Sequence, residues 1–296
     1  MACANGDPRQ GWLAIASDLA HITLMTGRVL IIAGSDPSGG AGIQADIKAV
    51  TTLGGYAMTA ITALTVQNTT GVQGVMALPP DFIRHQIDAV LSDVGADVIK
   101  IGMLGNREIA EAVADAIDLL TDEIQVIVDP VLVATSGNTL SDDGVKPVLL
   151  DRLMPRAALS TPNVDEATAL TGEAISCTDD LRRAGEILFA MTKAPVLLKG
   201  GHLSGDSVED ILLTSDGATS FSHARIETTS THGTGCTLAS AIAAGLGQGA
   251  TLGQAIKRAR AFLLEAIRTA PGFGAGHGPV NHGHTVQSRW QRFEDF

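Results

Sequence analysis

Residues 29–54 read VLIIAGSDPSGGAGIQADIKAVTTLG, an apolar run that passes through a glycine-rich turn into a helical pattern. The first part, VLIIAG (29–34), is short and apolar and ends at glycine, which is typical of a strand buried on both faces of a parallel sheet. In GIQADIKAVTTLG (42–54) the apolar residues recur near helical spacing. The stretch therefore predicts a strand, a turn and a helix.

The same alternation continues along the chain. Further buried strands are predicted at DVIKIG (97–102), VIVDP (126–130), ALSTPN (158–163) and VLLKGG (196–201), and further helices at DFIRHQIDAVLSDV (81–94), REIAEAVADAIDLL (107–120) and LRRAGEILFAM (181–191). Repeated β-α units predict an α/β fold with a central, mainly parallel sheet, helices on both faces and right-handed crossovers.

A different rhythm occupies residues 207–226, where two extended segments surround Asp216-Gly217 and predict an antiparallel hairpin at one edge of the sheet. A helix is then expected from the glycines at 233–235 to about Leu246, and another near 251–268. We expect one domain over 26–282, because no linker interrupts it. Residues 1–25 are expected to be a disordered extension or the product of an upstream start. Residues 283–296 are expected to be a tail, and the segment from Gly272 either a surface lid or a frayed end.

Composition narrows the function. The 296 residues are 45% hydrophobic and only 18% charged, which is typical of a compact globular protein. A net charge of −12 without any Lys/Arg run argues against binding to nucleic acid or to an anionic membrane. The widely spaced Cys3, Cys177 and Cys236 suit a reducing cytoplasm rather than a disulfide framework or a zinc site. The first 25 residues hold no long apolar span, so export is not expected.

The segment THGTGC (231–236) precedes an Ala-rich helix. Gly233 and Gly235 let backbone N–H groups converge on an anion, and the helix dipole adds positive potential there. Cys236 lies in the first turn, where the dipole is expected to lower the thiol pKa, so that the thiolate can accept a hydroxyl proton. Taken alone, the pattern favours a small buried cysteine behind a glycine helix start.

The turn AGSDPSGGAGIQAD (33–46) has neither the Gly-Lys-Ser/Thr ending of a P-loop nor GxGxxG spacing. With Asp36 and Asp46 it suits the wall of a small-substrate pocket in which a carboxylate binds a hydroxyl. A strand-helix turn with Asp36 as an exposed cap is equally compatible with the spacing.

Two further positions are candidate contacts for a flat ligand. Gln67, in TALTVQNTTG (62–71), carries an amide that donates and accepts in one plane, as a heteroaromatic ring with an adjacent amino group requires. A role in a turn is the alternative. Met103 follows a predicted strand and either packs in the core or lines an aromatic-ligand pocket.

Polar residues end several predicted strands. Asp129 and Glu166 offer the oxygen ligands that Mg²⁺ prefers, and Lys199 offers a positive charge. Asn163 and Glu166 also have the spacing of a helix capping pair. Because the carboxyl ends of parallel strands meet at one edge of the sheet, a shared site is expected there.

Taken together, the strings AGSDPSGGAGIQADIK, TALTVQNT, KIGML, VDPV, TPNVDEA, KGGH, THGTGCTLASAIA and GHGPVNH resemble the hydroxymethylpyrimidine/phosphomethylpyrimidine kinase family of thiamine biosynthesis, a branch of the ribokinase-like superfamily. The resemblance extends from about Arg28 to His282. It implies an ATP- and Mg²⁺-dependent kinase that phosphorylates 4-amino-5-hydroxymethyl-2-methylpyrimidine and then its monophosphate. A cytoplasmic enzyme, assembled as a homodimer, is the corresponding expectation.

The resemblance also implies roles for individual residues. On the substrate side, Gln67 would read the pyrimidine edge, Asp46 would lie near the hydroxymethyl group, and Gly34 and Met103 would complete the pocket. On the nucleotide side, Lys199 and Asn163 would contact ATP, and Asp129 and Glu166 would surround Mg²⁺ and its waters. Thr234, as a further ATP contact, and Gly235 would form the anion hole. Cys236, Gly235 and Gly233 would be the catalytic positions.

Two alternatives remain open. A pyridoxal kinase on the same scaffold would also bind a flat ring with a hydroxymethyl group, although Gln67 and Cys236 favour the pyrimidine. A catalytically silent metabolite-binding protein is the other alternative, and the retention of Asp129, Lys199 and GTGC argues against it.

Overall fold

The computed structural model describes residues 26–133, 137 and 140–286. Within them, nine strands form one sheet in the order β3-β2-β1-β4-β5-β6-β7-β8-β9. Pairing is parallel from β2 through β7 and antiparallel for β3 at one end and for β8 and β9 at the other. The strands are β1 (Arg28–Ser35), β2 (Tyr56–Asn68), β3 (Gly71–Ala77), β4 (Val98–Ile101), β5 (Gln125–Val128), β6 (Leu159–Ser160), β7 (Val196–Leu198), β8 (Ser207–Thr214) and β9 (Gly217–Ala224).

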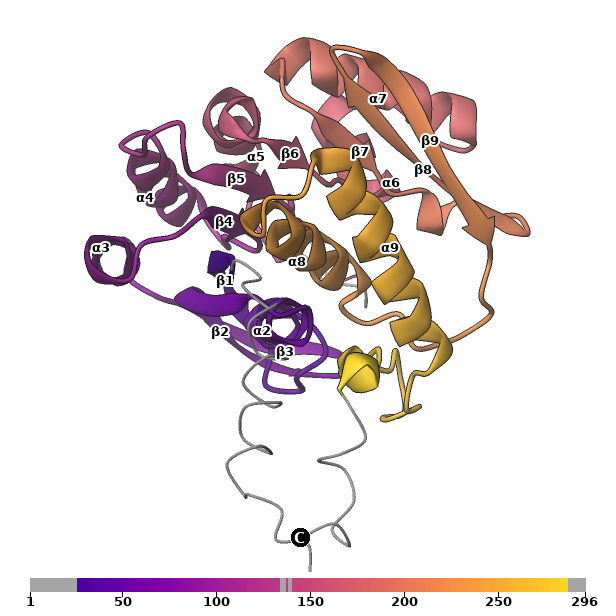
Figure 1. The fold of residues 1–296 in the computed structure, drawn as a ribbon, viewed down its shortest axis with the longest axis horizontal. Helices are drawn as coiled ribbons and strands as arrows, with labels where there is room; N and C mark the ends of the chain where they lie inside the picture. The colour runs from indigo at the N-terminus through magenta and orange to yellow at the C-terminus, as the bar shows by residue number, and fades with distance from the viewer. Residues whose placement is uncertain (1–25, 134–136, 138–139, 287–296) are drawn as a thin grey trace, which may run out of the picture.

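Helices cover both faces of this sheet, as predicted (Figure 1). One face carries α2 (Gly42–Thr52), α8 (Thr234–Gly247) and α9 (Leu252–Arg268). The other carries α3 (Pro80–Asp93), α4 (Arg107–Ile117), α5 (Val145–Val148), α6 (Val164–Thr171) and α7 (Thr178–Thr192), and α5 continues into the turns Leu149–Leu153 and Met154–Arg156. The sheet is therefore the middle layer of three.

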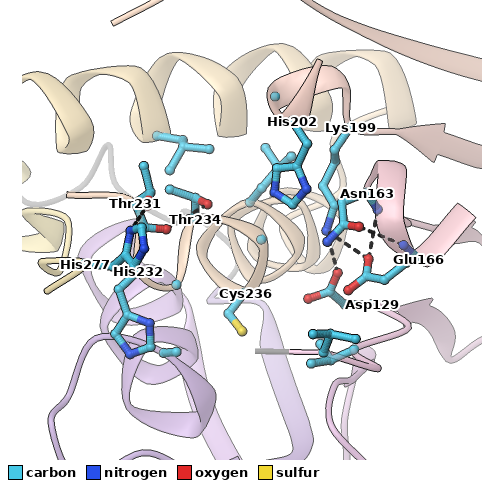
Figure 2. A pocket seen from close by; sticks show the side chains of 18 of the residues that line it. Asp129, Asn163, Glu166, Lys199, His202, Thr231, His232, Thr234, Cys236 and His277 are labelled. Atoms are coloured by element: carbon cyan, nitrogen blue, oxygen red, sulfur yellow. Dashed lines mark hydrogen bonds and ion pairs between the residues drawn. The ribbon is translucent and has the colours of Figure 1, made fainter. Parts of the chain in front are cut away.

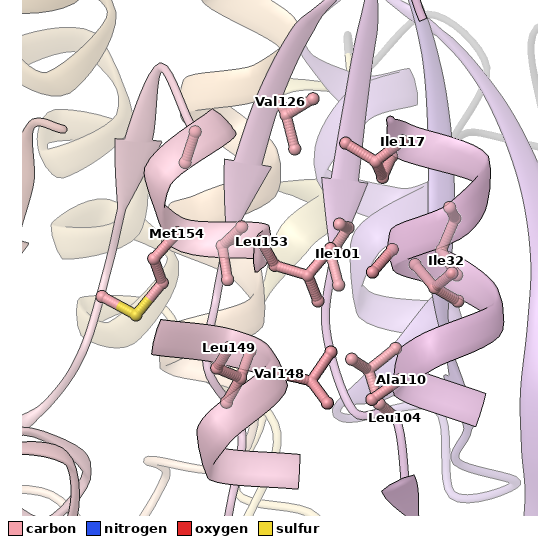
Figure 3. Packing of buried hydrophobic residues seen from close by; sticks show 14 of the residues in the cluster. Ile32, Ile101, Leu104, Ala110, Ile117, Val126, Val148, Leu149, Leu153 and Met154 are labelled. Atoms are coloured by element: carbon pink, nitrogen blue, oxygen red, sulfur yellow. The ribbon is translucent and has the colours of Figure 1, made fainter. Parts of the chain in front are cut away.

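Successive side chains of β1 point to opposite faces of the sheet, and helices cover both faces. Leu30 and Ile32 pack into the core under α3 and α4, whereas Val29 and Ile31 pack into the core under α2 and α8. Figure 3 shows the first core, in which Ile101 of the central strand β4 lies among the side chains of neighbouring strands and helices. The apolar runs that predicted buried parallel strands thus become the centre of the molecule.

The expected edge hairpin is confirmed, since β8 and β9 pair antiparallel across Asp216-Gly217. A second hairpin, formed by β2 and β3, was not predicted. Its strands lie at the other edge and expose Val66, Val75 and Met76, so the burial contrast that marks a strand is weak there. Gln67 consequently lies near the end of a strand, and the turn comes after it.

The C-terminal segment is docked as far as the structure describes it. The backbone N–H of His277 donates to the Thr69 carbonyl at 2.8 Å, and His232 N–H donates to the Gly278 carbonyl at 3.0 Å. Up to residue 286 the segment is therefore not a frayed end, and it lies against the β2-β3 turn. The predicted extension 1–25 and the last part of the tail, from residue 287, lie outside the described residues. No helix within the described ranges is both long and apolar enough to cross a membrane.

Candidate active site

A pocket of about 530 Å³ opens at the carboxyl ends of the parallel strands, beside the start of α8. Figure 2 shows Cys236 between a histidine group, which includes His232 and His277, and a charged group, which includes Asp129 and Lys199. Every residue predicted for the site lines this pocket except Asp46, namely Gly34, Gln67, Met103, Asp129, Asn163, Glu166, Lys199, Gly233, Thr234, Gly235 and Cys236.

The first turn of α8 forms the anion cradle. Gly233 precedes the helix in the left-handed conformation (φ 78°), and a Cβ there would lie 1.8 Å from the carbonyl oxygen of Gly40. Only glycine fits this close approach. The backbone N–H groups of Gly235 and Cys236 donate to no acceptor among the described residues. They are the unpaired donors of a helix N-terminus and are available to an anion.

The expected activation of Cys236 is wrong. Burial, together with the carboxylates of Asp46 and Asp129, raises the pKa of its thiol to about 12, although the cation of Lys100 opposes the shift. The helix dipole therefore does not generate a thiolate, because desolvation of the sulfur outweighs it. At neutral pH Cys236 is a neutral thiol.

Lys199 lies between two carboxyl groups at the charged end of the pocket. Its Nζ lies 2.9 Å from Asp129 Oδ1 and 3.8 Å from Glu166 Oε2. Burial alone would raise the pKa of Asp129, but the cations of Lys199 and Lys100 hold it below the usual value. Burial raises the pKa of Glu166 to about 7 even though Lys199 opposes the shift. The two carboxyl groups thus differ in charge near neutral pH.

Asn163 and Glu166 form the predicted capping pair. The Asn163 side chain accepts from the Glu166 N–H at 2.9 Å, and Glu166 Oε2 accepts from the Asn163 N–H at 2.8 Å. Asn163 also bridges to Lys199 as a parallel pair, which continues the β6-β7 ladder into the site. The structural role of Asn163 is therefore to start α6 at the edge of the pocket.

The carboxylate oxygens in this region are suitable ligands for Mg²⁺. Asp129 Oδ2 is buried and has no hydrogen-bond partner, so a negatively charged oxygen is left for a cation. The described residues contain no ready cluster of His, Cys, Asp and Glu that would hold a metal by itself. Mg²⁺ commonly takes one or two carboxylates and completes its shell with water and phosphate oxygens. Asp129 and Glu166 match that requirement.

Gly34, Met103 and Gln67 also line the pocket. A Cβ on Gly34 would lie 3.0 Å from Met103 Sδ, so the glycine makes room for the methionine. Gln67 Oε1 accepts from the Thr65 hydroxyl at 3.2 Å, and its Nε2 lies 3.5 Å from His232 Nε2. The glutamine amide is thus held at the pocket wall.

Asp36 is not an exposed cap. It is only 2% exposed, and its carboxylate accepts from the backbone N–H groups of Ser38, Gly40 and Ala41 and from His232 Nε2. Its oxygens are therefore committed to the protein. The sequence alone gives no role for His232, because its position beside Gln67 depends on the fold.

Asp46 requires a correction, because it does not face the pocket. Its side chain is fully buried, and its oxygens lie 3.0 and 3.1 Å from Lys100 Nζ, while Oδ1 accepts from the Ser240 hydroxyl at 2.7 Å. The helical period turns this position of α2 under α8, away from the substrate space. Lys100 lines the pocket instead. The signal for Lys100 was a single charge inside an otherwise apolar strand, since lysine is almost never fully buried unless it is paired.

Comparisons with known proteins agree with this geometry. The family model described as phosphomethylpyrimidine kinase matches residues 36–281. The chain is 45% identical over 256 residues to the hydroxymethylpyrimidine/phosphomethylpyrimidine kinase of Bacillus subtilis, covering 86% of this chain and 94% of that protein. It is 51% identical over 257 residues to the thiamine biosynthesis bifunctional protein ThiED of Geobacter sulfurreducens, covering 86% of this chain but only 52% of that longer protein.

Among solved structures, the pyridoxal kinase of Staphylococcus aureus in complex with AMP-PCP superimposes with a TM-score of 0.81 at 33% identity. The match covers 88% of this chain and 95% of that one.

Proposed function

The chain belongs to the phosphomethylpyrimidine kinase family, and from that premise we propose how its pocket performs the two phosphorylations. The enzyme transfers the γ-phosphoryl group of ATP to 4-amino-5-hydroxymethyl-2-methylpyrimidine and then to the monophosphate, as a hydroxymethylpyrimidine/phosphomethylpyrimidine kinase of thiamine biosynthesis. A pocket of about 530 Å³ suits small-molecule partners.

One observation carries the proposal. Cys236, at the start of α8 where the N–H groups of Gly235 and Cys236 are unpaired, lies between His232 on one side and Lys199 with Asp129 on the other (Figure 2). Gln67 belongs to the His232 side, because its Nε2 lies 3.5 Å from His232 Nε2. A Cβ on Gly235 would lie 3.0 Å from Lys199 Nζ, which puts the cradle and the cation side by side. A phosphoryl group in transit between a ring substrate and a nucleotide needs this arrangement of donors.

The residues divide the work of an in-line transfer. Gln67 and Met103 orient the ring so that its hydroxymethyl oxygen points toward the start of α8. The O–P bond to the substrate forms there while the bond between the γ-phosphorus and the ADP oxygen breaks. The N–H groups of Gly235 and Cys236 and the ammonium of Lys199 stabilise the negative charge on the transferred group. Asp129 and Glu166 would hold Mg²⁺, which when bound neutralises phosphate charge.

Cys236 acts as a neutral thiol close to the reacting oxygen. Because burial raises the pKa of the thiol to about 12, it does not start as a base. In a loose transition state the substrate oxygen becomes acidic only late, so a strong base is not required, and its proton passes to an oxygen of the transferred phosphoryl group. In the second phosphorylation the nucleophile is a phosphate oxygen that has already lost its proton, so Cys236 should matter less.

A pyridoxal kinase is the second candidate, because a solved pyridoxal kinase shares the fold at 33% identity. A coupled ADP-release assay with hydroxymethylpyrimidine, its monophosphate and pyridoxal separates the candidates. We expect turnover with both pyrimidines. Turnover with pyridoxal alone would reject the substrate assignment, and no turnover with any of them under Mg-ATP would reject the kinase assignment.

We also propose that residues 26–282 form a single kinase domain. The enzyme is cytoplasmic, and two copies of the chain assemble as a homodimer. The acidic charge and the sparse cysteines support the cytoplasmic location. Sedimentation equilibrium tests the assembly, and a monomer at micromolar concentration would reject the dimer.

A further inference from the structure

A row of buried charges with alternating sign runs beneath the pocket, in the order Asp46, Lys100, Asp129, Lys199 and Glu166. Lys199 and its two acidic neighbours belong to the nucleotide side already described. Lys100 and Asp46 are both fully buried, and the proposed mechanism leaves them without a role.

Lys100 forms an ion pair with Asp46 on one side and lines the pocket on the other. Its Nζ lies 3.0 Å from Asp46 Oδ2, and Asp46 Oδ1 also accepts from the Ser240 hydroxyl at 2.7 Å. On the other side the same Nζ lies 4.0 Å from Asp129 Oδ2, the oxygen without a hydrogen-bond partner. Lys100 lines the pocket, whereas Asp46 does not, so the positive end of the pair is directed at the site.

Neighbouring atoms pack closely around the ammonium group of Lys100. A Cβ on Gly102 would lie 3.0 Å from both the Lys100 Nζ and the Ala33 Cβ, so the glycine is what admits the ammonium group. Burial alone would lower the pKa of Lys100, but the carboxylates of Asp46 and Asp129 hold it above its usual value. Lys100 therefore stays an ammonium ion and is excluded as a general base.

Burying such a pair is not an efficient way to stabilise a fold. Buried ion pairs can often be replaced by apolar groups of similar volume without loss of stability. A fixed cation in a water-poor site is instead effective at stabilising negative charge, because it needs no reorganisation during the reaction.

We propose that Lys100 is a positioning residue for phosphoryl transfer, which orients the free oxygen of Asp129 and supplies a fixed positive potential to the pocket that it lines together with Cys236. Asp46 and Ser240 are its anchor. The inference rests on the proposed kinase function and deepens it. Asp46 thus serves the reaction through Lys100 rather than through the substrate.

The test must separate this role from a purely structural one. Lys100→Met alone would leave Asp46 as an uncompensated buried charge and could unfold the protein. The double variant Asp46→Asn/Lys100→Met removes both charges at nearly constant volume. Arg28→Met/Asp97→Asn is the matched control. It removes an ion pair where β1 and β4 begin, whereas the pocket lies at the carboxyl ends of the strands.

Two readouts are measured in a Cys3→Ser/Cys177→Ser background. The first is the rate at which iodoacetamide alkylates Cys236 at pH 9 in the protein without nucleotide, and the second is kcat for each phosphorylation. For the folded Asp46/Lys100 variant we expect the alkylation rate to fall by about threefold, because loss of the Lys100 cation raises the thiol pKa more than loss of the Asp46 carboxylate lowers it. We expect kcat to fall by about tenfold or more, with KM for the pyrimidine within about twofold. The control pair should leave both unchanged.

A folded double variant that keeps both rates would overturn the proposal. So would a loss of kcat with unchanged alkylation, because Lys100 would then not set the potential at Cys236. If the double variant does not fold, Ser240→Ala removes one anchor of Asp46 and should lower both rates by about threefold, and unchanged rates would again overturn it. Alkylation needs no turnover, so it remains decisive even if no pyrimidine is phosphorylated and the proposed function fails.

Discussion

His232 Nε2 lies 2.8 Å from Asp36 Oδ2, and both side chains are buried at the wall of the pocket. Burial opposes ionisation of Asp36, but hydrogen bonds from His232, Ser38 and Ala41 hold the pKa of its carboxyl below the usual value. The carboxylate is therefore an acceptor, and His232 Nε2 carries the proton. This contact joins the turn after β1 to the loop before α8, so it holds two parts of the pocket wall together.

Asp36→Asn tests that junction. The amide cannot accept all the hydrogen bonds of the carboxylate, so we expect a loss of about 1–3 kcal/mol in the free energy of unfolding at pH 7 and a raised KM for the pyrimidine. Because the folded pKa of Asp36 is depressed, its contribution is present at neutral pH and disappears as pH falls through that lowered pKa. Urea unfolding at pH 7 and pH 3 checks this. A difference from wild type that does not shrink at low pH would contradict it, and Asp165→Asn, at an exposed pair with His202, is the control.

Gly233→Ala should disable the cradle. The left-handed backbone costs a non-glycine residue about 1–2 kcal/mol, and the new Cβ would collide with the Gly40 carbonyl. We expect a lower melting temperature and at least a tenfold loss of kcat. Gly201→Ala is the matched control, because Gly201 also lines the pocket and has nothing within 4 Å of an added Cβ. Equal effects of the two substitutions would remove Gly233 from the cradle.

Gln67→Leu should weaken recognition of the ring. The substrate groups that Gln67 pairs with would be buried without partners, at about 1–3 kcal/mol, which is roughly a 5- to 150-fold rise in KM. Steady-state kinetics with varied pyrimidine measures it. Asn68→Ala is the control, since that neighbouring amide is exposed and only accepts from the turn at Thr70. Unchanged affinity of the Gln67 variant would take this residue out of the substrate site.

Cys236→Ala should slow the first phosphorylation more than the second. The thiol is neutral, with a pKa of about 12, so we expect a loss of about 10- to 100-fold rather than the larger losses seen when a true general base is removed. The affinity for ATP should stay within about twofold, as measured by calorimetry. If the first step keeps its rate, the thiol takes no part in the proton transfer.

Glu166 should make stability depend on pH. Its pKa is about 7 in the folded protein and near 4.5 in the unfolded chain, so the folded state binds the proton more tightly. The free energy of unfolding should therefore fall as pH rises from about 4.5 to 7, by up to about 3 kcal/mol, and then level off. Glu166→Gln should flatten this component in urea titrations at pH 5, 6, 7 and 8. If the free energies of unfolding of wild type and variant differ by the same amount at all four pH values, the raised pKa of Glu166 is wrong.

The fold class and the family could be read from the chain because their signals are local. Apolar runs ending at glycine or proline gave β1, β4, β5 and β7 within a few residues, and Asp216-Gly217 gave the β8-β9 hairpin. The β2-β3 hairpin was missed because an exposed edge strand does not need a continuous apolar run.

The sequence by itself determined the order of the β-α units, and thereby that the residues after the strands would meet at one edge of the sheet. It also placed GTGC at the start of a helix, where the first backbone N–H groups have no partner within the helix, whichever side chains are present. Only the tertiary structure decided which charges are desolvated and what they face. It turned Asp46 under α8 toward Lys100, brought His232 to Asp36, and made the Cys236 thiol neutral. The physical reason is that burial and pairing depend on contacts between segments far apart in the chain, and these contacts outweigh the local dipole that the sequence displays.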